Sequence, residues 1–494
     1  MLECLFRLAS VGRRIMPKAG IISLGCPKNL VDSEVMMGVL ARNGYEFTPR
    51  AEEADVLVVN TCSFIAPAQK ESIDTILEMA EYKKFGAAKK LIVAGCLVER
   101  YRDQIREQIP EVDAVIGTGE LENILAAVEG TLRADAENAA GLPSYLYHDL
   151  TPRILSTPKH AAYIKIAEGC DHPCTFCIIP QLRGNFRSRR FESVVREAEN
   201  LAASGVREVT LIGQDTTSYG EDLNLRDGLA VLLERLAGVD GLQWVRFLYC
   251  YPNRVTQRLL DTIAAHPRLA KYMDMPLQHA SRNVLARMKR GSSGEAFLQL
   301  LGRIRATIPG VSLRTSFIVG FPGETDSDFS ELCDFVEAAE FDWMGVFPYS
   351  DVDNASSFAL DQKVDEDTIQ ERQNRLMQIQ QKISARKLRR FRGQRATALV
   401  EGPSKDTPLV WEARLEGMAP DIDGKVYLND IQVPGTDLSA QPSDVVTVEI
   451  TESHEYDLVA LVVEILDVPR PAAQSAATAP VQRVNTGAAL RIFQ

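Results

Sequence analysis

The chain has 494 residues, of which 45% are hydrophobic, so it can hold about three domains with buried cores, and global disorder is excluded. No apolar run approaches the ~20 residues of a membrane span, and residues 1–17 lack the order of a secretory signal. Nine cysteines in a chain of net charge −12 favour thiols and metal ligands over disulfides. We therefore expect a cytoplasmic protein with no membrane partner, in which residues 1–17 are an extension that includes Cys4.

Residues 18–130 repeat one pattern three times: a buried strand, a turn and an amphipathic helix. This alternation predicts a doubly wound, parallel α/β domain. One cysteine follows each strand directly, at Cys26, Cys62 and Cys96. Right-handed crossovers bring strand ends to one edge, so these thiols should converge, with Gly25 and Gly95 allowing close backbone approach. The alternative interpretation is that these are three ordinary buried cysteines. Because each cysteine occupies the same position in its repeat, a shared cluster is favoured.

A polar linker is predicted over residues 131–155. Residues 156–388 then contain six strand candidates separated mostly by helical patterns, which predicts a partial (β/α)6 barrel with chemistry at the carboxyl ends of its strands. A long connecting helix should run from about Glu366 to Phe391. Cys250 and Cys333 have no companions at ligand spacing and are predicted to be core thiols.

The loop EGCDHPCTFCIIP follows the first of these strands and carries Cys170, Cys174 and Cys177. The spacing of these cysteines matches neither the bacterial nor the plant-type ferredoxin pattern, in which four cysteines ligate a cluster. A zinc site would need a second cysteine pair or nearby histidines. Pro173 and Pro180 hold the loop in a non-helical form. Three thiolates leave one position of a four-iron cluster open.

Residues 389–467 show short strands with turns, which predicts a small five-stranded antiparallel β-barrel. From Ala396 to Asp467 there are 3 Lys/Arg against 15 Asp/Glu, a net of −12, whereas Lys382–Arg395 carries seven basic residues and no acid. The acidic unit suits a basic protein partner, with Asp421, Asp423, Asp430 and Glu452 as candidate contacts. The basic run fits either a contact with RNA or a solvated helix face. The Pro/Ala-rich tail, residues 468–494, is predicted to be disordered.

The three-cysteine loop resembles the radical S-adenosylmethionine superfamily. That resemblance implies a 4Fe-4S cluster on Cys170, Cys174 and Cys177, whose fourth iron is chelated by S-adenosylmethionine. Nearly the whole chain resembles the narrower methylthiotransferase family, in which a TRAM-like barrel follows the radical barrel. Cys26, Cys62 and Cys96 match the cysteines that hold a second, auxiliary 4Fe-4S cluster with an open iron for sulfur delivery.

Two branches of that family modify different macromolecules. The stretches SLGCPKNLVDSE, CTFCIIPQLRGNFRSR, GQDTTSYG and MPLQHAS look like the branch that methylthiolates the β-carbon of an aspartate in ribosomal protein S-twelve, giving 3-methylthioaspartate. The tRNA branch, which acts on isopentenyladenosine, reads closer to GCQMN at the first cysteine and GQNV after the second barrel strand. An acidic barrel would be repelled by tRNA phosphates, so tRNA is the less favoured substrate.

The resemblance also implies an electron donor, such as a flavodoxin or ferredoxin, and residues that contact S-adenosylmethionine. Strand ends of the predicted barrel suggest such contacts at Gln214, Asp215, Gly320, Phe321 and Gly323, although a simple turn explains GFPGE almost as well. Phe176 and Ile178 flank Cys177 and are predicted to cover the cluster and the adenine. A non-catalytic iron–sulfur carrier or a ribosome-binding module is the rival hypothesis, but a carrier needs no vacant iron.

Overall fold

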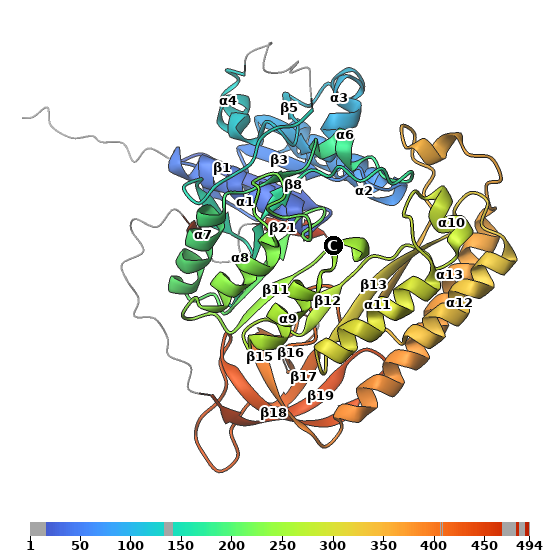
Figure 1. The fold of residues 1–494 in the computed structure, drawn as a ribbon. Coiled ribbons are helices and arrows are strands. Elements are labelled where there is room, and N and C mark those ends of the chain that lie inside the picture. Colours follow the sequence, from blue (N-terminus) through green and yellow to red (C-terminus); the bar gives the residue numbers. More distant parts are fainter. Residues whose placement is uncertain are drawn as a thin grey trace, which may run out of the picture.

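The computed structural model describes residues 16–132, 142–405, 407 and 409–466, with the backbone of residues 481–483 and 490–493. Three units follow one another along the chain, and Figure 1 shows the central barrel between the N-terminal α/β unit and the C-terminal β-barrel. This arrangement confirms the predicted fold class. Most of the predicted extension, including Cys4, lies outside the described residues.

The N-terminal unit is a parallel sheet in the order β2-β1-β3-β4-β5, with helices on both faces. One face packs against α1 and α4, through Met36, Leu40 and Ile124, and the other against α2 and α3, through Met79 and Leu97. Its strands are β1 (Lys18–Leu24), β2 (Glu46–Phe47), β3 (Val56–Thr61), β4 (Lys90–Gly95) and β5 (Ala114–Ile116), and its helices are α1 (Pro27–Arg42), α2 (Ala66–Phe85), α3 (Cys96–Gln108) and α4 (Ile124–Glu129). The doubly wound prediction is therefore confirmed.

The six predicted strands of the central unit all form. They make two parallel three-stranded sheets, β7-β10-β11 and β12-β13-β14, which meet at a bridge between Val245 and Leu269. The strands are β7 (Ala161–Lys165), β10 (Glu208–Ile212), β11 (Trp244–Phe247), β12 (Tyr272–Asp274), β13 (Ser312–Val319) and β14 (Trp343–Pro348). The surrounding helices are α7 (Phe191–Ala203), α8 (Gly228–Ala237), α9 (Gln257–Ala265), α10 (Arg282–Arg287), α11 (Gly294–Thr307), α12 (Asp326–Ala339) and α13 (Glu366–Leu388). Cys250 and Cys333 are buried core thiols, as predicted.

The C-terminal unit is a closed barrel in the order β15-β16-β17-β19-β18. Its strands are β15 (Arg395–Pro403), β16 (Trp411–Leu415), β17 (Val426–Asp430), β18 (Val445–Ser453) and β19 (Leu458–Ile465). The purely antiparallel prediction is wrong at one place, because β17 and β19 are parallel. Five strands cannot alternate in direction all the way around a closed barrel, so one neighbouring pair must run the same way.

The tail contains two strands that the sequence did not predict. β20 (Val481–Arg483) pairs with β6 (Arg153–Leu155), and β21 (Leu490–Phe493) pairs with β1. The prediction of disorder is wrong for these two stretches, and the rest of residues 468–494 lies outside the described part. β2 is only two residues long, so the backbone groups of β1 beyond it are left for another strand to pair.

The predicted linker ends in a buried tie between two units. Arg153 is 1% exposed, and its guanidinium donates to Glu34 Oε2 of α1 at 2.8 and 2.6 Å and to Glu197 Oε1 of α7 at 2.7 Å. The last residues of the linker therefore fix the sheet of the N-terminal unit onto the barrel. Among the described helices, none combines the length and apolar character needed to cross a bilayer.

Replacing Arg153 by Ala should lower the free energy of unfolding by about 3–5 kcal/mol, because the buried Glu34 loses this guanidinium and the buried Glu197 keeps only one of its two, that of Arg189. Chemical denaturation followed by circular dichroism measures this loss. Arg196→Ala is the matched control, since its guanidinium is 56% exposed and pairs with Asp149, and it should cost no more than about 1 kcal/mol. Equal effects of the two substitutions would contradict the structural role of the buried tie.

Candidate active site

The three N-terminal cysteines lie where parallel strands end, as the repeats predicted. Cys26 is the N-cap of α1, Cys62 follows β3 and Cys96 begins α3. The backbone approaches closely here: Gly25 has φ +83°, and a Cβ on it would lie 2.7 Å from Cys62 Cβ and 2.9 Å from Cys62 Sγ. Gly95 has φ +95°, and a Cβ there would collide with the Asn60 side chain. Both positions therefore require glycine.

Nearby cations favour one of these thiols as thiolate. Burial alone would raise the pKa of Cys26, but Lys28 and Arg183 outweigh it, and the pKa is lowered. Burial and the neighbouring Cys26 raise the pKa of Cys62 to about 11, and burial raises that of Cys96 to about 12. The N-terminal triad, Cys26 with Cys62 and Cys96, is thus one electrostatically coupled group.

The second triad lies in the loop between β8 (Ala167–Glu168) and α6 (Ile179–Arg183), at the carboxyl edge of the barrel. His172 of this loop lies 2.6 Å from Asp215 Oδ2, which follows β10, and its ring stacks on Tyr251 at 3.8 Å between centroids. Arg290 packs over the same Tyr251 ring and its Nη1 donates to Cys174 Sγ at 3.6 Å. The barrel's strand ends therefore hold the loop of Cys170, Cys174 and Cys177, which we call the loop triad.

Arg183 connects the two triads. It lies at the end of α6, six residues after Cys177, and its Nη2 donates to Cys96 Sγ at 3.6 Å and to Asn29 Oδ1 at 2.8 Å. Ile178 and Leu182, also from the stretch that follows Cys177, pack in one buried cluster with Cys96. The prediction that Ile178 covers the loop triad is therefore incomplete, since this side chain packs against the N-terminal triad. The sequence analysis quoted Arg183 within CTFCIIPQLRG but assigned it no role.

The other predicted cofactor residues divide into two groups. The side chains of Gln214 and Asp215 serve the loop, because Gln214 Nε2 donates to Glu168 Oε1 at 2.8 Å and Asp215 pairs with His172. Gly320 and Gly323 both have positive φ, and the amides of Gly320 and Phe321 donate to Glu324 Oε2.

Phe176 of the cysteine loop belongs to the second group. It packs against the buried cluster that contains Phe321. The GFPGE turn and the loop triad are therefore adjacent.

Each triad offers three free thiols, the donor type that iron–sulfur clusters use. Each triad also has a guanidinium at one sulfur, Arg183 at Cys96 and Arg290 at Cys174, which offsets the negative charge of bound thiolates.

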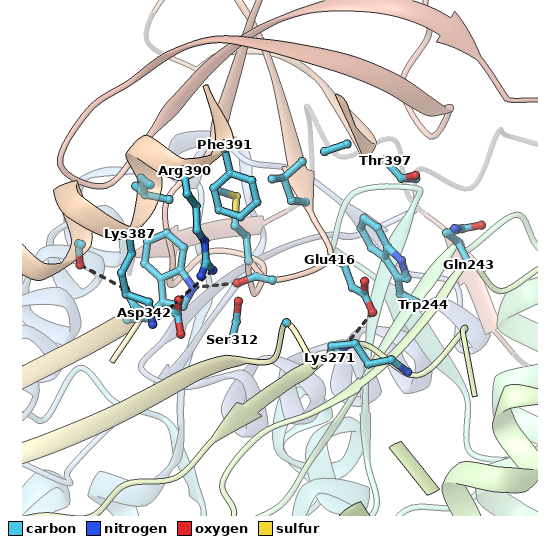
Figure 2. A pocket seen from close by; sticks show the side chains of 18 of the residues that line it. Gln243, Trp244, Lys271, Ser312, Asp342, Lys387, Arg390, Phe391, Thr397 and Glu416 are labelled. Atoms are coloured by element: carbon cyan, nitrogen blue, oxygen red, sulfur yellow. Dashed lines mark hydrogen bonds and ion pairs between the residues drawn. The ribbon is translucent and has the colours of Figure 1, made fainter. Parts of the chain in front are cut away.

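A cavity of about 380 Å³ lies elsewhere, between the amino edge of the central strands and the C-terminal barrel. Figure 2 shows the Lys387 side chain beside Asp342, with which it pairs at 2.8 Å, whereas Glu416 accepts from the backbone amide of Lys271 at 2.8 Å. These groups satisfy one another, and neither cysteine triad contributes to the lining. We therefore place the active site at the triads.

Each of the three units matches a known family model. Family models match residues 18–117 (uncharacterized protein family UPF0004), 164–336 (radical SAM superfamily) and 393–463 (TRAM domain). Proteins named ribosomal protein uS12 methylthiotransferase RimO are similar over 90% of this chain: that of Solibacter usitatus is 64% identical over 94% of its own length, and that of Koribacter versatilis 57% over 96%. The chain belongs to this methylthiotransferase family.

The family uses S-adenosylmethionine and 4Fe-4S clusters, and the enzyme is a radical transferase with a C-terminal TRAM domain. A third member, from Trichlorobacter lovleyi, is 46% identical over 90% of this chain and 98% of its own. Among solved structures, the radical S-adenosylmethionine methyltransferase TsrM from Kitasatospora setae aligns with 67% of this chain and 72% of its own at 17% identity. The TM-score of this alignment is 0.49.

Gly25→Ala should displace Cys62 and reduce the iron content after anaerobic reconstitution from about eight to about four atoms per chain. Gly44→Ala is the matched control, because Gly44 has a similar φ of +86° but no atom within 4 Å of an added Cβ. Both substitutions introduce backbone strain, and only the first collides with a cysteine. Full iron content in Gly25→Ala would contradict the assignment of this edge as a cluster site.

Proposed function

We propose that this enzyme replaces a β-hydrogen of an aspartate in ribosomal protein uS12, the S-twelve of the sequence analysis, with a methylthio group. The observation that carries the proposal is the tie between two three-cysteine sites, in which Arg183 follows the loop triad and donates to a sulfur of the N-terminal triad. Two open-iron sites held together fit a reaction that needs both a radical and a sulfur source. The names of the relatives support the choice of protein substrate.

We assign the radical cluster to Cys170, Cys174 and Cys177 and the auxiliary cluster to Cys26, Cys62 and Cys96. When bound, these clusters and S-adenosylmethionine supply the one-electron and sulfur chemistry that an unactivated carbon requires. The chain's own residues position that chemistry: Asp215 and Tyr251 hold His172 and with it the cysteine loop.

A second set of contacts shapes the turn that we assign to S-adenosylmethionine. Glu324 fixes the amides of Gly320 and Phe321, and Arg372 Nη1 in turn donates to Glu324 Oε1 at 2.9 Å. Burial raises the pKa of Glu324 to about 7, against the opposing effect of Arg372. We propose that Gly320, Phe321 and Gly323, with Phe176 beside them, contact the cofactor, while Gln214 and Asp215 act through the loop.

Modification of isopentenyladenosine in tRNA is the second candidate function. The C-terminal barrel argues against it, because its acidic side chains oppose nucleic-acid phosphates. We propose a cytoplasmic enzyme that receives electrons from a donor such as a flavodoxin or ferredoxin. The exposed part of Lys382–Arg395 remains a candidate contact to ribosomal RNA, although Arg386 and Lys387 already pair with Glu340 and Asp342.

Variants that lack one triad or the other should lose different activities. Replacing Cys170, Cys174 and Cys177 together by Ala should leave about four of about eight irons and abolish cleavage of S-adenosylmethionine. Replacing the N-terminal triad should also leave about four irons but spare reductive cleavage, while mass spectrometry finds no methylthio group on uS12. Equal loss of both activities in the two folded variants would contradict separate roles.

The acidic docking prediction needs one correction. The Asp423 carboxylate is 1% exposed and accepts a hydrogen bond from the Tyr272 hydroxyl at 2.7 Å, so it supports the barrel junction and does not face a partner. Burial raises its pKa to about 6. Asp421, Asp430 and Glu452 are exposed and remain candidates.

Changing these three acidic residues to Lys should weaken uS12 binding at least about threefold, since each exposed charge contributes about 0.2–1 kcal/mol. Wild-type affinity should also fall as salt rises. The control reverses three exposed charges elsewhere, at Asp74, Glu81 and Asp240, and should bind uS12 normally. Calorimetry that finds the same affinity for both variants would exclude docking through the barrel.

A further inference from the structure

Lys28 is a buried cation without a carboxylate partner. It is 8% exposed and lies in the first turn of α1, two residues after Cys26. Within the described part of the chain, no carboxylate forms an ion pair with it; the groups that act on it are Tyr249, Cys26 and Arg183. A buried ammonium is normally paired with an anion, because its desolvation is costly. The structure therefore provides a positive charge for which it provides no carboxylate.

The nearest carboxylate along the helix is fully used. Asp32 lies one turn further along α1, and its Oδ1 accepts from Lys165 Nζ at 2.5 Å. Its Oδ2 accepts from Arg183 Nη1 at 2.9 Å. Both oxygens of Asp32 are thus engaged by cations of the barrel unit, Lys165 and Arg183. The Lys28 ammonium can therefore pair with a different anion.

The position of this ammonium is fixed by the barrel. Lys28 Nζ lies 3.4 Å from the centroid of the Tyr249 ring, and Tyr249 follows β11 at the carboxyl edge of the barrel. Tyr249 has φ +64°, an uncommon conformation for a non-glycine residue. Its amide donates to Asp274 Oδ2 at 3.0 Å and its carbonyl accepts from the Thr216 amide at 3.1 Å, so the backbone is held there. The ring therefore supports Lys28 where the N-terminal triad faces the barrel mouth.

We propose that Lys28, supported by the Tyr249 ring, binds the carboxylate of the substrate aspartate between the two cysteine triads. This inference rests on the proposed function, in which the substrate carries a carboxylate on the carbon next to the reacting one. Isopentenyladenosine has no carboxylate. Lys28 is then a specificity-determining residue for a protein substrate.

The competing role for Lys28 is to offset the charge of Cys26 and its cluster. A double-mutant cycle separates the two roles. Reconstituted wild-type enzyme and Lys28→Met are each titrated with uS12 and with uS12 whose target aspartate is replaced by asparagine. A charge-assisted hydrogen bond predicts that wild type prefers the aspartate form about tenfold and that Lys28→Met shows no preference. Lys28→Arg should restore the preference.

Iron analysis and the visible spectrum of each variant report separately on the cluster. Lys271→Met is the matched control: its ammonium donates to the carbonyls of Ile263, His266 and Leu269 at the opposite edge of the barrel, and this variant should keep the wild-type preference. If Lys28→Met misfolds, Lys28→Gln repeats the cycle with a polar side chain.

Two results would overturn the proposal. One is a wild-type preference for aspartate in Lys28→Met and in Lys28→Gln. The other is an equal loss of affinity for both uS12 forms together with loss of iron, which would assign Lys28 to the cluster alone. Failure of the wild-type enzyme to add a methylthio group to uS12 would instead overturn the proposed function.

Discussion

The architecture depends on one buried guanidinium. Arg183 Nη1 donates to Asp32 of the N-terminal unit at 2.9 Å and to Glu168 of the barrel at 3.2 Å, and Lys165 bridges the same two carboxylates. Burial alone would raise the pKa of Glu168, but Lys165 and Arg183 keep it well below its usual range. Two cations and two carboxylates thereby compensate one another, and removal of any one would leave a buried charge less well paired.

The hydrogen bonds of Arg183 to Asp32 and Glu168 hold the loop triad at one position relative to the N-terminal triad. Hydrogen bonds have preferred directions, whereas apolar contacts tolerate sliding, so the guanidinium fixes orientation as well as proximity. The same short helix delivers Ile178 and Leu182 to Cys96. Arg153 makes a second buried tie between α1 and α7. The two triads consequently lie on either side of one buried, hydrogen-bonded junction.

The C-terminal barrel is attached at the other end of the central strands (Figure 1). Trp343, the first residue of β14, donates from its indole to the Gly417 carbonyl at 2.8 Å, and Arg414 pairs with Glu208 at the start of β10 at 2.6 Å. The acidic surface therefore lies away from the cysteine triads. A uS12 molecule that docked on this surface would therefore have to reach the triads with a different segment.

The sequence by itself determined most of the elements and the positions of the candidate cysteine ligands. Strands, helices and the six cysteines follow from periodicity and spacing between near neighbours, and these local signals survive in the structure. Only the tertiary structure decided what Arg183 and Lys28 touch, that Asp423 is buried, and that β21 extends the first sheet. Those outcomes join residues from separate units, such as Asp32 with Arg183, and depend on how folded units pack. No local pattern encodes such packing, because the partner of a buried charge is chosen by the geometry of the whole junction.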